Sequence, residues 1–277
     1  MLKHTFIHIP KVGRVTERKI WEAGVLTWED AASRGAPGVP SQLLDHFLQL
    51  SFYALERGNV RFFLEMLPSA EIWRLLVNPS MQLSICYLDI ETTGLRPDVS
   101  ELTVAGLYDG VELKYFISGQ NLEELYEEIR RYDLIVTFNG KSFDVPFLKA
   151  SLPGIEVPEA HIDLRYLLKQ VGLAGGLKAI ERTTGMARMQ DELSLLDGYD
   201  AVTLWQLHKR GVEDALPTLL RYNAEDVVSL KPLLELACRM HIEQMQTGFA
   251  LPEVSERAVP EMPYSIELIR RLREGRS

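Results

Sequence analysis

Four acidic residues, in three separate stretches of the chain, have the side chains best suited to chemistry. Asp89 and Glu91 lie in YLDIETTGL, directly after an apolar run, and Asp144 lies in FNGKSFDVPFL. Asp226 lies in YNAEDVVSL, four residues after Tyr222, so these two side chains share one face of a predicted helix. The same face continues with leucines, and an aspartate on an apolar face is costly to bury unless it is paired or bound to a cation.

A single pair of acids at a strand end is more often surface charge than part of a site, but four acids in one pocket would repel one another. Two unit charges ~4 Å apart cost ~4 kcal/mol at an effective dielectric constant of about 20. One or two hard divalent cations with oxygen ligands would remove this repulsion. Two such ions ~3.5–4 Å apart suit phosphodiester hydrolysis, because one activates water and the other stabilises the leaving oxygen.

An α/β sheet is predicted to position these acids. The five predicted strands cover residues 83–90, 102–110, 111–118, 134–138 and 160–164. An Asp-Gly pair joins the second and third strands as a hairpin. Helices predicted at 121–133 and 141–151 precede the fourth and fifth strands, so the first, fourth and fifth strands are expected to be parallel. Asp89 lies at the end of the first strand and Asp144 follows the fourth, at the edge where ligands of open α/β sheets collect.

The remainder of the chain is predicted to be mostly helical. A length of 277 residues suits one main domain with an extension. We therefore expect a helical N-terminal region at 1–80, a catalytic domain at 81–245 and a C-terminal tail, punctuated by prolines, at 246–277.

Composition excludes several classes of protein. The apolar content of 46% and charged content of 25% are ordinary for a globular protein, and the net charge of -9 provides no global attraction for nucleic acid. Any contact with a polyanion therefore needs a local basic patch. Two cysteines are too few for a disulfide framework or a cysteine zinc site. With no signal-peptide pattern and no apolar run of membrane length, a cytoplasmic protein without a membrane partner is expected.

The stretches LDIETTGL, FNGKSFDVPFL and YNAEDVVSL resemble, in this order, the three exonuclease motifs of the DEDD group in the ribonuclease-H-like superfamily. The group includes DnaQ-type 3′–5′ exonucleases and the proofreading domains of family B polymerases. The resemblance covers about residues 83–243. It implies a ribonuclease-H-like fold and a 3′–5′ exonuclease of DNA or RNA that uses two ions of Mg or Mn. The implied ligands and catalytic residues are Asp89, Glu91, Asp144 and Asp226.

The third motif resembles the DEDDy branch of this group. That branch has a tyrosine four residues before the last aspartate, where this chain has Tyr222; the other branch has a histidine where this chain has Arg221. The resemblance implies that the Tyr222 hydroxyl orients the attacking water, since a tyrosine with a pKa of ~10 is a poor base. A tyrosine that only packs against the core is the alternative. Glu225, beside Asp226, is predicted to be solvated.

Two further stretches, FIHIPKVGRVTERKIWEAGVLTWEDA and EMLPSAEIWRLL, resemble segments of the YprB-like branch of bacterial ribonuclease-H-like proteins, so the whole chain is similar to this branch. The exonuclease resemblance also implies substrate contacts. Thr92, Thr93 and Leu95 would contact the terminal nucleotide, with Leu95 able to wedge against a base. Asn139 and Lys141 would touch phosphate.

The N-terminal stretch IPKVGRVTERKIWEAGV resembles half of a helix-hairpin-helix motif, whose turn binds backbone phosphate. Lys11 stands where the first glycine of that turn is usual, and Gly13 is kept. Lys11 and Arg14 would therefore contact nucleic acid, in a segment where residues 1–20 hold five Lys or Arg against one acid. A solvated basic helix face is an equal alternative. Two other functions stay open, a structure-specific endonuclease and a non-catalytic nucleic-acid-binding module, and protein partners are unknown.

Overall fold

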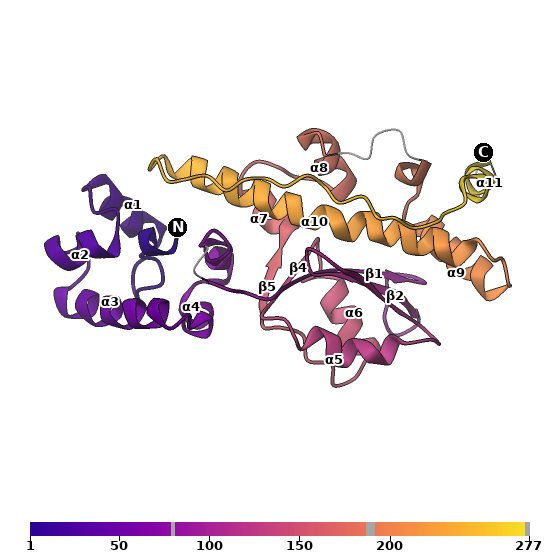
Figure 1. Ribbon diagram of the computed structural model, residues 1–277, viewed down its shortest axis with the longest axis horizontal. Helices are drawn as coiled ribbons and strands as arrows, with labels where there is room; N and C mark the ends of the chain where they lie inside the picture. The colour runs from indigo at the N-terminus through magenta and orange to yellow at the C-terminus, as the bar shows by residue number, and fades with distance from the viewer. Residues whose placement is uncertain (79–80, 187–191, 275–277) are drawn as a thin grey trace. The chain divides into compact units, whose positions relative to one another are not determined.

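The computed structural model describes residues 1–78, 81–186 and 192–274 (Figure 1). The chain forms two compact units, and neither is a continuous stretch of sequence. We call Met1–Leu83 with Glu235–Val254 the helical unit, and Ser84–Leu234 with Ser255–Ser277 the sheet unit. These boundaries differ from a division at residues 80 and 245. Within the described ranges, no helix combines the length and apolar character needed to cross a membrane.

The sheet unit contains a mixed five-stranded sheet in the order β3-β2-β1-β4-β5. The strands are β1 (Ile85–Thr92), β2 (Leu102–Tyr108), β3 (Leu113–Ile117), β4 (Leu134–Thr137) and β5 (Ala160–Asp163). β1, β4 and β5 are parallel, whereas β2 pairs antiparallel with both β1 and β3. The predicted mixed sheet, with its antiparallel hairpin on one side, is confirmed.

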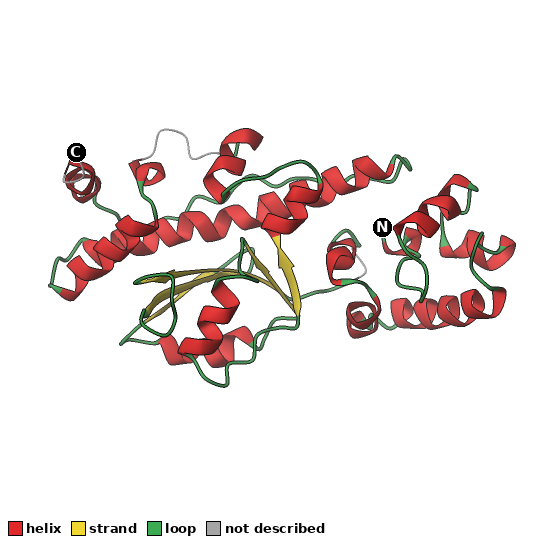
Figure 2. Cartoon of the chain, turned by 180° about the vertical axis from the view of Figure 1, so that it is seen from behind, coloured by secondary structure: helices red, strands yellow, loops and turns green. Residues whose placement is uncertain are grey.

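Helices cover both faces of this sheet. The helices that belong wholly or partly to the sheet unit are η3 (Leu122–Glu124), α5 (Leu125–Ile129), α6 (Asp144–Ser151), α7 (Leu164–Gln170), α8 (Leu177–Thr184), η4 (Glu192–Leu195), α9 (Gly198–Lys209), α10 (Ala215–Met245) and α11 (Ile266–Glu274). Within the sheet unit, α5 and α6 lie on one face, and the first two-thirds of α10 lies along the other (Figure 2). The sheet is therefore the middle of three layers.

Alternation along β1 decides which side chain enters which layer. Leu88 and Ile90 belong to a buried cluster with Phe147 and Leu148 of α6. Since successive side chains of a strand point to opposite faces, the odd-numbered side chains of β1 point toward α10. The spacing of two residues between Asp89 and Glu91 thus places both acids on the α10 face.

The helical unit confirms the predicted helical N-terminal region. Its elements, besides the end of α10, are η1 (Leu2–His4), α1 (Arg14–Glu22), α2 (Trp28–Arg34), α3 (Ser41–Glu56), α4 (Val60–Met66) and η2 (Ser69–Leu75).

Two turns of the same form lead into α1 and α3. Lys11 and Gly38 both have left-handed backbone, with φ of 71° and 79°. In each turn the next residue, Val12 or Val39, donates its N–H to the carbonyl three residues earlier. Lys11 thus has a backbone conformation that favours glycine, which costs on the order of 1–3 kcal/mol for a residue with a side chain.

Candidate metal centre

Three of the four predicted acids meet at the end of β1. Asp89, Glu91 and Asp226 each offer a carboxylate oxygen, and these oxygens all lie within 4.8 Å of one another. Asp89 and Glu91 come from the α10 face of β1, and Asp226 comes from α10 itself. The pairing of β1 with β2 shifts register between Glu91 and Thr92, an irregularity that is common beside functional sites.

Asp144 approaches the same strand end from α6. It is the first residue of that helix, it is buried, and its Oδ1 accepts the backbone N–H of Ile90 at 3.2 Å. Its position is thus fixed by the peptide between Asp89 and Glu91, although it is not one of the three acids whose oxygens lie within 4.8 Å of one another.

The electrostatics of the buried acids favour a bound cation. Burial raises the pKa of the Glu91 carboxyl well above its usual range, and the nearby charge of Asp226 raises it further. Burial also raises the pKa of Asp144 to about 7. These shifts mean that negative charge is unfavourable there in the absence of a cation. Clustered carboxylate oxygens are the donors that Mg²⁺, Mn²⁺ and Ca²⁺ prefer, so the residues present fit a divalent cation.

Asn223 orients the acids and is a site residue that sequence reasoning missed. This fully buried residue donates from Nδ2 to Oδ2 of Asp89 at 2.9 Å and to the Asp89 carbonyl at 3.3 Å. A hydrogen bond from Asn223 also opposes the rise in the pKa of Glu91. Asn223 precedes Asp226 by three residues, a spacing that places both on one helix face and could have revealed it.

Gly106 provides the space that Asn223 occupies. Gly106 pairs with Asp89 across β1 and β2, and a Cβ at this position would lie 1.9 Å from Oδ1 of Asn223. A side chain cannot be accommodated at that distance. The glycine in the interior of a predicted strand was itself a signal of close approach.

Gly106→Ala is expected to displace Asn223 and so disturb the metal ligands. We predict that the affinity for Mn²⁺ falls about 10–100-fold, the effect typical of losing a group that orients a ligand. Overpacking should also lower the free energy of unfolding by about 1–3 kcal/mol. Calorimetric Mn²⁺ titration and thermal unfolding measure the two effects. Gly198→Ala is the matched control, because its Cβ would have no heavy atom within 4 Å; equal Mn²⁺ affinity in both variants would contradict the assignment.

Tyr222 is buried, and the ammonium group of Lys178 lies over its ring. Nζ of Lys178, in α8, lies 4.7 Å from the centroid of that ring. Lys178 also donates to the Leu196 carbonyl. Its charge is close enough to lower the pKa of Glu91, against the larger effects of burial and Asp226. Lys178 lies in no recognised motif, so the sequence alone gave no signal for it.

The prediction that Glu225 is solvated is wrong. Its side chain is only 2% exposed and forms ion pairs with Arg221, at 2.8 Å, and with Arg257. Arg221 also donates to the carbonyl of Met262 at 3.0 Å. Arg257 and Met262 of the C-terminal tail thus pack against α10 next to Asp226. The positive charge of Arg257 neutralises the buried carboxylate of Glu225.

The predicted nucleotide-contacting residues lie at the end of β1 and in the loop that follows it. The Thr92 hydroxyl donates to the carbonyl of Gly94 at 2.7 Å, and the Thr93 hydroxyl accepts the N–H of Glu101 at 2.8 Å. Both threonine hydroxyls therefore hold the loop. The side chain of Leu95 is 83% exposed and accessible to a ligand.

Asp163 organises the loop that carries Asn139 and Lys141. Its carboxylate accepts the backbone N–H groups of Asn139 and Lys141 at 2.8 and 3.0 Å, and it also caps α7. Asn139 has left-handed backbone, with φ of 68°, and its side-chain oxygen accepts from Arg165 at 2.7 Å. Lys141 is exposed.

The two predicted nucleic-acid contacts of the helical unit lie at the start of α1. Lys11 is exposed in the left-handed turn. Arg14, the first residue of α1, pairs through Nε with Glu71 at 2.5 Å, while its side chain stays 55% exposed.

One family model matches the chain over residues 86–238, and its description is RNase_H superfamily. No curated protein sequence matches the chain.

Several solved structures are similar to part of the chain. The family B DNA polymerase of the hyperthermophilic archaeon Pyrobaculum calidifontis is 17% identical with a TM-score of 0.45, covering 61% of this chain and 27% of the polymerase. Brucella melitensis NrnC with bound Mg²⁺ is 20% identical with a TM-score of 0.41, covering 60% of this chain and 79% of NrnC. The Aedes aegypti Nibbler EXO domain is 14% identical with a TM-score of 0.43, covering 60% of this chain and 82% of that domain. This chain thus corresponds to about a quarter of the polymerase.

Proposed function

The chain belongs to the RNase_H superfamily, and from that premise we propose that it is a metal-dependent 3′–5′ exonuclease of DNA or RNA, of the DEDDy type and the YprB-like branch. The observation that carries this proposal is the cluster of Asp89, Glu91 and Asp226 at the carboxyl end of β1. These acids come from two of the three exonuclease-like motifs, and Asp144 from the third lies against the same strand end.

A role is proposed for each side chain of this site, and the contacts of the acids support the first of them. Asp89, Glu91, Asp144 and Asp226 would hold two ions of Mg or Mn. When bound, these ions would activate water and stabilise the leaving oxygen. Asn223 fixes the Asp89 carboxylate in the orientation that faces the other acids. The Tyr222 hydroxyl would orient the attacking water.

Substrate binding is proposed for residues of the loops near this centre and of the helical unit. Thr92, Thr93 and Leu95 would contact the terminal nucleotide, with Leu95 wedged against its base. Asn139 and Lys141 would contact a phosphate. In the helical unit, Lys11 and Arg14 would contact the backbone of nucleic acid. The expected cytoplasmic location stays a prediction.

An end-labelled single strand, incubated with the protein and Mn²⁺, tests the proposal. We expect mononucleotides to be released from the 3′ end. When that end is chemically blocked, we expect no release. Cleavage that continues on the blocked strand would favour a structure-specific endonuclease instead. Binding of the strand without any cleavage would favour a non-catalytic nucleic-acid-binding module.

Tyr222→Phe separates water orientation from packing, since it removes only the hydroxyl. We expect turnover to fall about 10–100-fold, as is typical when a reacting group loses its orientation. Substrate affinity and the melting temperature should change little. Single-turnover kinetics beside a binding titration in Ca²⁺ distinguishes these quantities. Unchanged turnover would leave Tyr222 with a packing role only.

A further inference from the structure

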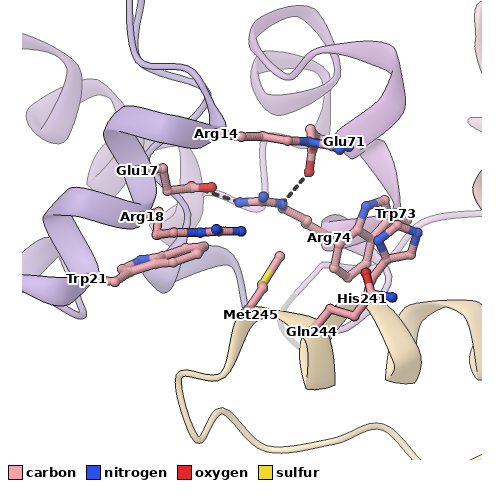
Figure 3. Close-up of a pocket in the computed structure, with 10 residues that line it drawn as sticks. All are labelled: Arg14, Glu17, Arg18, Trp21, Glu71, Trp73, Arg74, His241, Gln244 and Met245. Atoms are coloured by element: carbon pink, nitrogen blue, oxygen red, sulfur yellow. Dashed lines mark hydrogen bonds and ion pairs between the residues drawn. The ribbon is translucent and has the colours of Figure 1, made fainter. Parts of the chain in front are cut away.

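The helical unit contains a small cationic cavity that the proposed nuclease reaction does not use. Its volume is about 100 Å³. The lining residues are Arg14, Glu17, Arg18, Trp21, Glu71, Trp73, Arg74, His241, Gln244 and Met245 (Figure 3). All of them belong to the helical unit. A water molecule needs about 10–15 Å³ of such space, so the cavity has room for a group of several heavy atoms.

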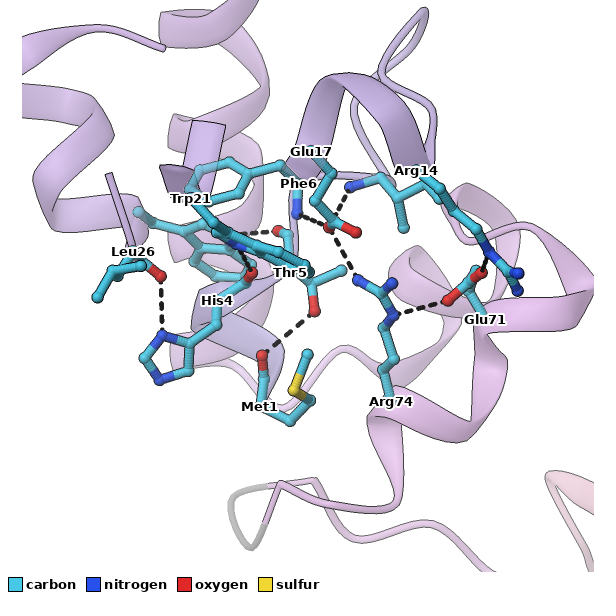
Figure 4. Close-up of polar contacts among 12 residues, drawn as sticks. Met1, His4, Thr5, Phe6, Arg14, Glu17, Trp21, Leu26, Glu71 and Arg74 are labelled. Carbon is cyan, nitrogen blue, oxygen red and sulfur yellow. Dashed lines mark hydrogen bonds and ion pairs between the residues drawn. The ribbon is translucent and has the colours of Figure 1, made fainter. Parts of the chain in front are cut away.

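A buried ion-pair network forms one wall of the cavity. Arg74 is 2% exposed and binds Glu17 at 2.8 Å and Glu71 at 2.7 Å (Figure 4). Glu17 also accepts the backbone N–H groups of Phe6 and Ile7 at 2.7 and 3.0 Å. Glu71 accepts from Arg14 as well. Each of the two carboxylates therefore already has several donors within this wall.

Arg18 adds a positive charge that these two acids do not pair with. It is exposed on α1, one turn beyond Arg14, and Figure 3 shows its guanidinium extending over Trp21 toward the side on which Arg74 lies. No described residue forms a hydrogen bond or an ion pair with Arg18. The lining thus carries three arginines against two glutamates, and the unmatched guanidinium is the accessible one.

A second unmatched donor lies in the same lining. The indole Nε1 of Trp73 is buried and has no hydrogen-bond partner among the described residues. Buried polar groups of this kind are generally satisfied by protein, water or ligand. An acceptor group in the cavity would match both this donor and the guanidinium of Arg18.

We propose that this cavity binds a phosphate group, with Arg18 as the principal donor and Arg14 as the second. Guanidinium groups bind phosphate through two parallel N–H donors, which makes arginine the preferred residue for this anion. Arg74 contributes positive charge from the wall. The phosphate comes either from a nucleic-acid backbone or from a small free phosphate compound. The proposal does not depend on nuclease activity, because the metal centre belongs to the sheet unit.

Tryptophan fluorescence provides a direct test, because two of the four tryptophans of the chain line the cavity. The full-length protein is titrated with inorganic phosphate at constant ionic strength, with chloride as the balancing anion. We expect a saturable change in the wild type. Arg18→Ala should bind phosphate at least about tenfold more weakly, the loss expected for a charge-assisted hydrogen bond.

Lys19→Ala is the matched control, since it removes one positive charge from an exposed neighbour on α1 that does not line the cavity. Its phosphate affinity should equal that of the wild type, and all three proteins should have the same melting temperature. The absence of a saturable change in the wild type would overturn the proposal, as would equal affinity of Arg18→Ala and Lys19→Ala. Asp89→Ala should leave the phosphate response intact even though it removes cleavage, so the two proposals fail separately.

Competition identifies the source of the phosphate. A single-stranded oligonucleotide is added in the presence of a chelator, so that the strand stays intact. If it displaces inorganic phosphate from the wild type, and Arg18→Ala weakens its binding, the ligand is a nucleic-acid backbone. If inorganic phosphate binds but the strand does not compete, the ligand is a small free phosphate compound.

Discussion

Replacing Asp89 with alanine is expected to reduce Mn²⁺-dependent release of nucleotides about a thousandfold or more, since a metal ligand supplies several kcal/mol of transition-state stabilisation. The reason is the geometry of the site, in which Asp89 lies with Glu91 and Asp226 around a single position. The substitution also removes the carboxylate oxygen that accepts from Asn223, so this buried amide loses the shorter of its two hydrogen bonds to residue 89. Initial rates on an end-labelled strand, with saturating Mn²⁺, measure the effect.

Asp45→Ala is a suitable control for this experiment. It makes the same chemical change at an exposed position of α3, so it should retain wild-type rates. A parallel Mn²⁺ titration distinguishes loss of metal from loss of chemistry, and we expect Asp89→Ala to bind Mn²⁺ more weakly. If wild type and Asp89→Ala release nucleotides at the same background rate, the exonuclease assignment fails.

The largest expected effect on stability comes from Arg74→Ala in the helical unit. Both carboxylates that Arg74 binds are almost fully buried, with exposures of 1% for Glu17 and 3% for Glu71. Removing one partner of such a network leaves uncompensated buried charge, which destabilises a protein by about 3–5 kcal/mol. Hydrogen exchange of the amides in α1 and η2 measures the change within this unit.

Exchange is preferable here to a single unfolding midpoint, because a chain with two units need not unfold in one step. Arg34→Ala provides the comparison. Arg34 also pairs with an acid, Asp30, but their side chains are 54% and 34% exposed. Such a surface pair contributes about 0–1 kcal/mol. Equal protection in Arg34→Ala and Arg74→Ala would show that the buried network does not stabilise the unit.

The sequence predicted the sheet because each of its signals was local. Alternation and apolar runs marked the strands, and an Asp-Gly pair marked the hairpin between β2 and β3. The proximity of Asp89 and Asp226 could also be predicted from the sequence. Three motifs in this order indicate one shared site, whereas a single motif does not. Gly106 and Asn223 were missed, because their relationship depends on how closely α10 approaches the sheet.

Other features needed information from distant parts of the chain. Periodicity indicates which face of a helix is apolar, but it does not show what covers the opposite face. Glu225 was therefore predicted to be solvated, and only the folded tail, with Arg257, explains its burial. The boundary between the units at Leu234 and Glu235 lies inside α10, which continues through Pro232 to Met245, so no change of secondary structure marks the boundary.

The interleaving of the two units along the chain has a consequence for biosynthesis. Domains usually fold in turn as the N-terminal one leaves the ribosome. Here the helical unit lacks Glu235–Val254, and the sheet unit lacks Arg257, until translation has passed these residues. Neither unit can therefore complete its folding until translation has passed residues 254–257, and the two units complete it almost together. A fragment that ends before residue 235 would leave the helical unit incomplete and the carboxylate of Glu225 without one of its arginines.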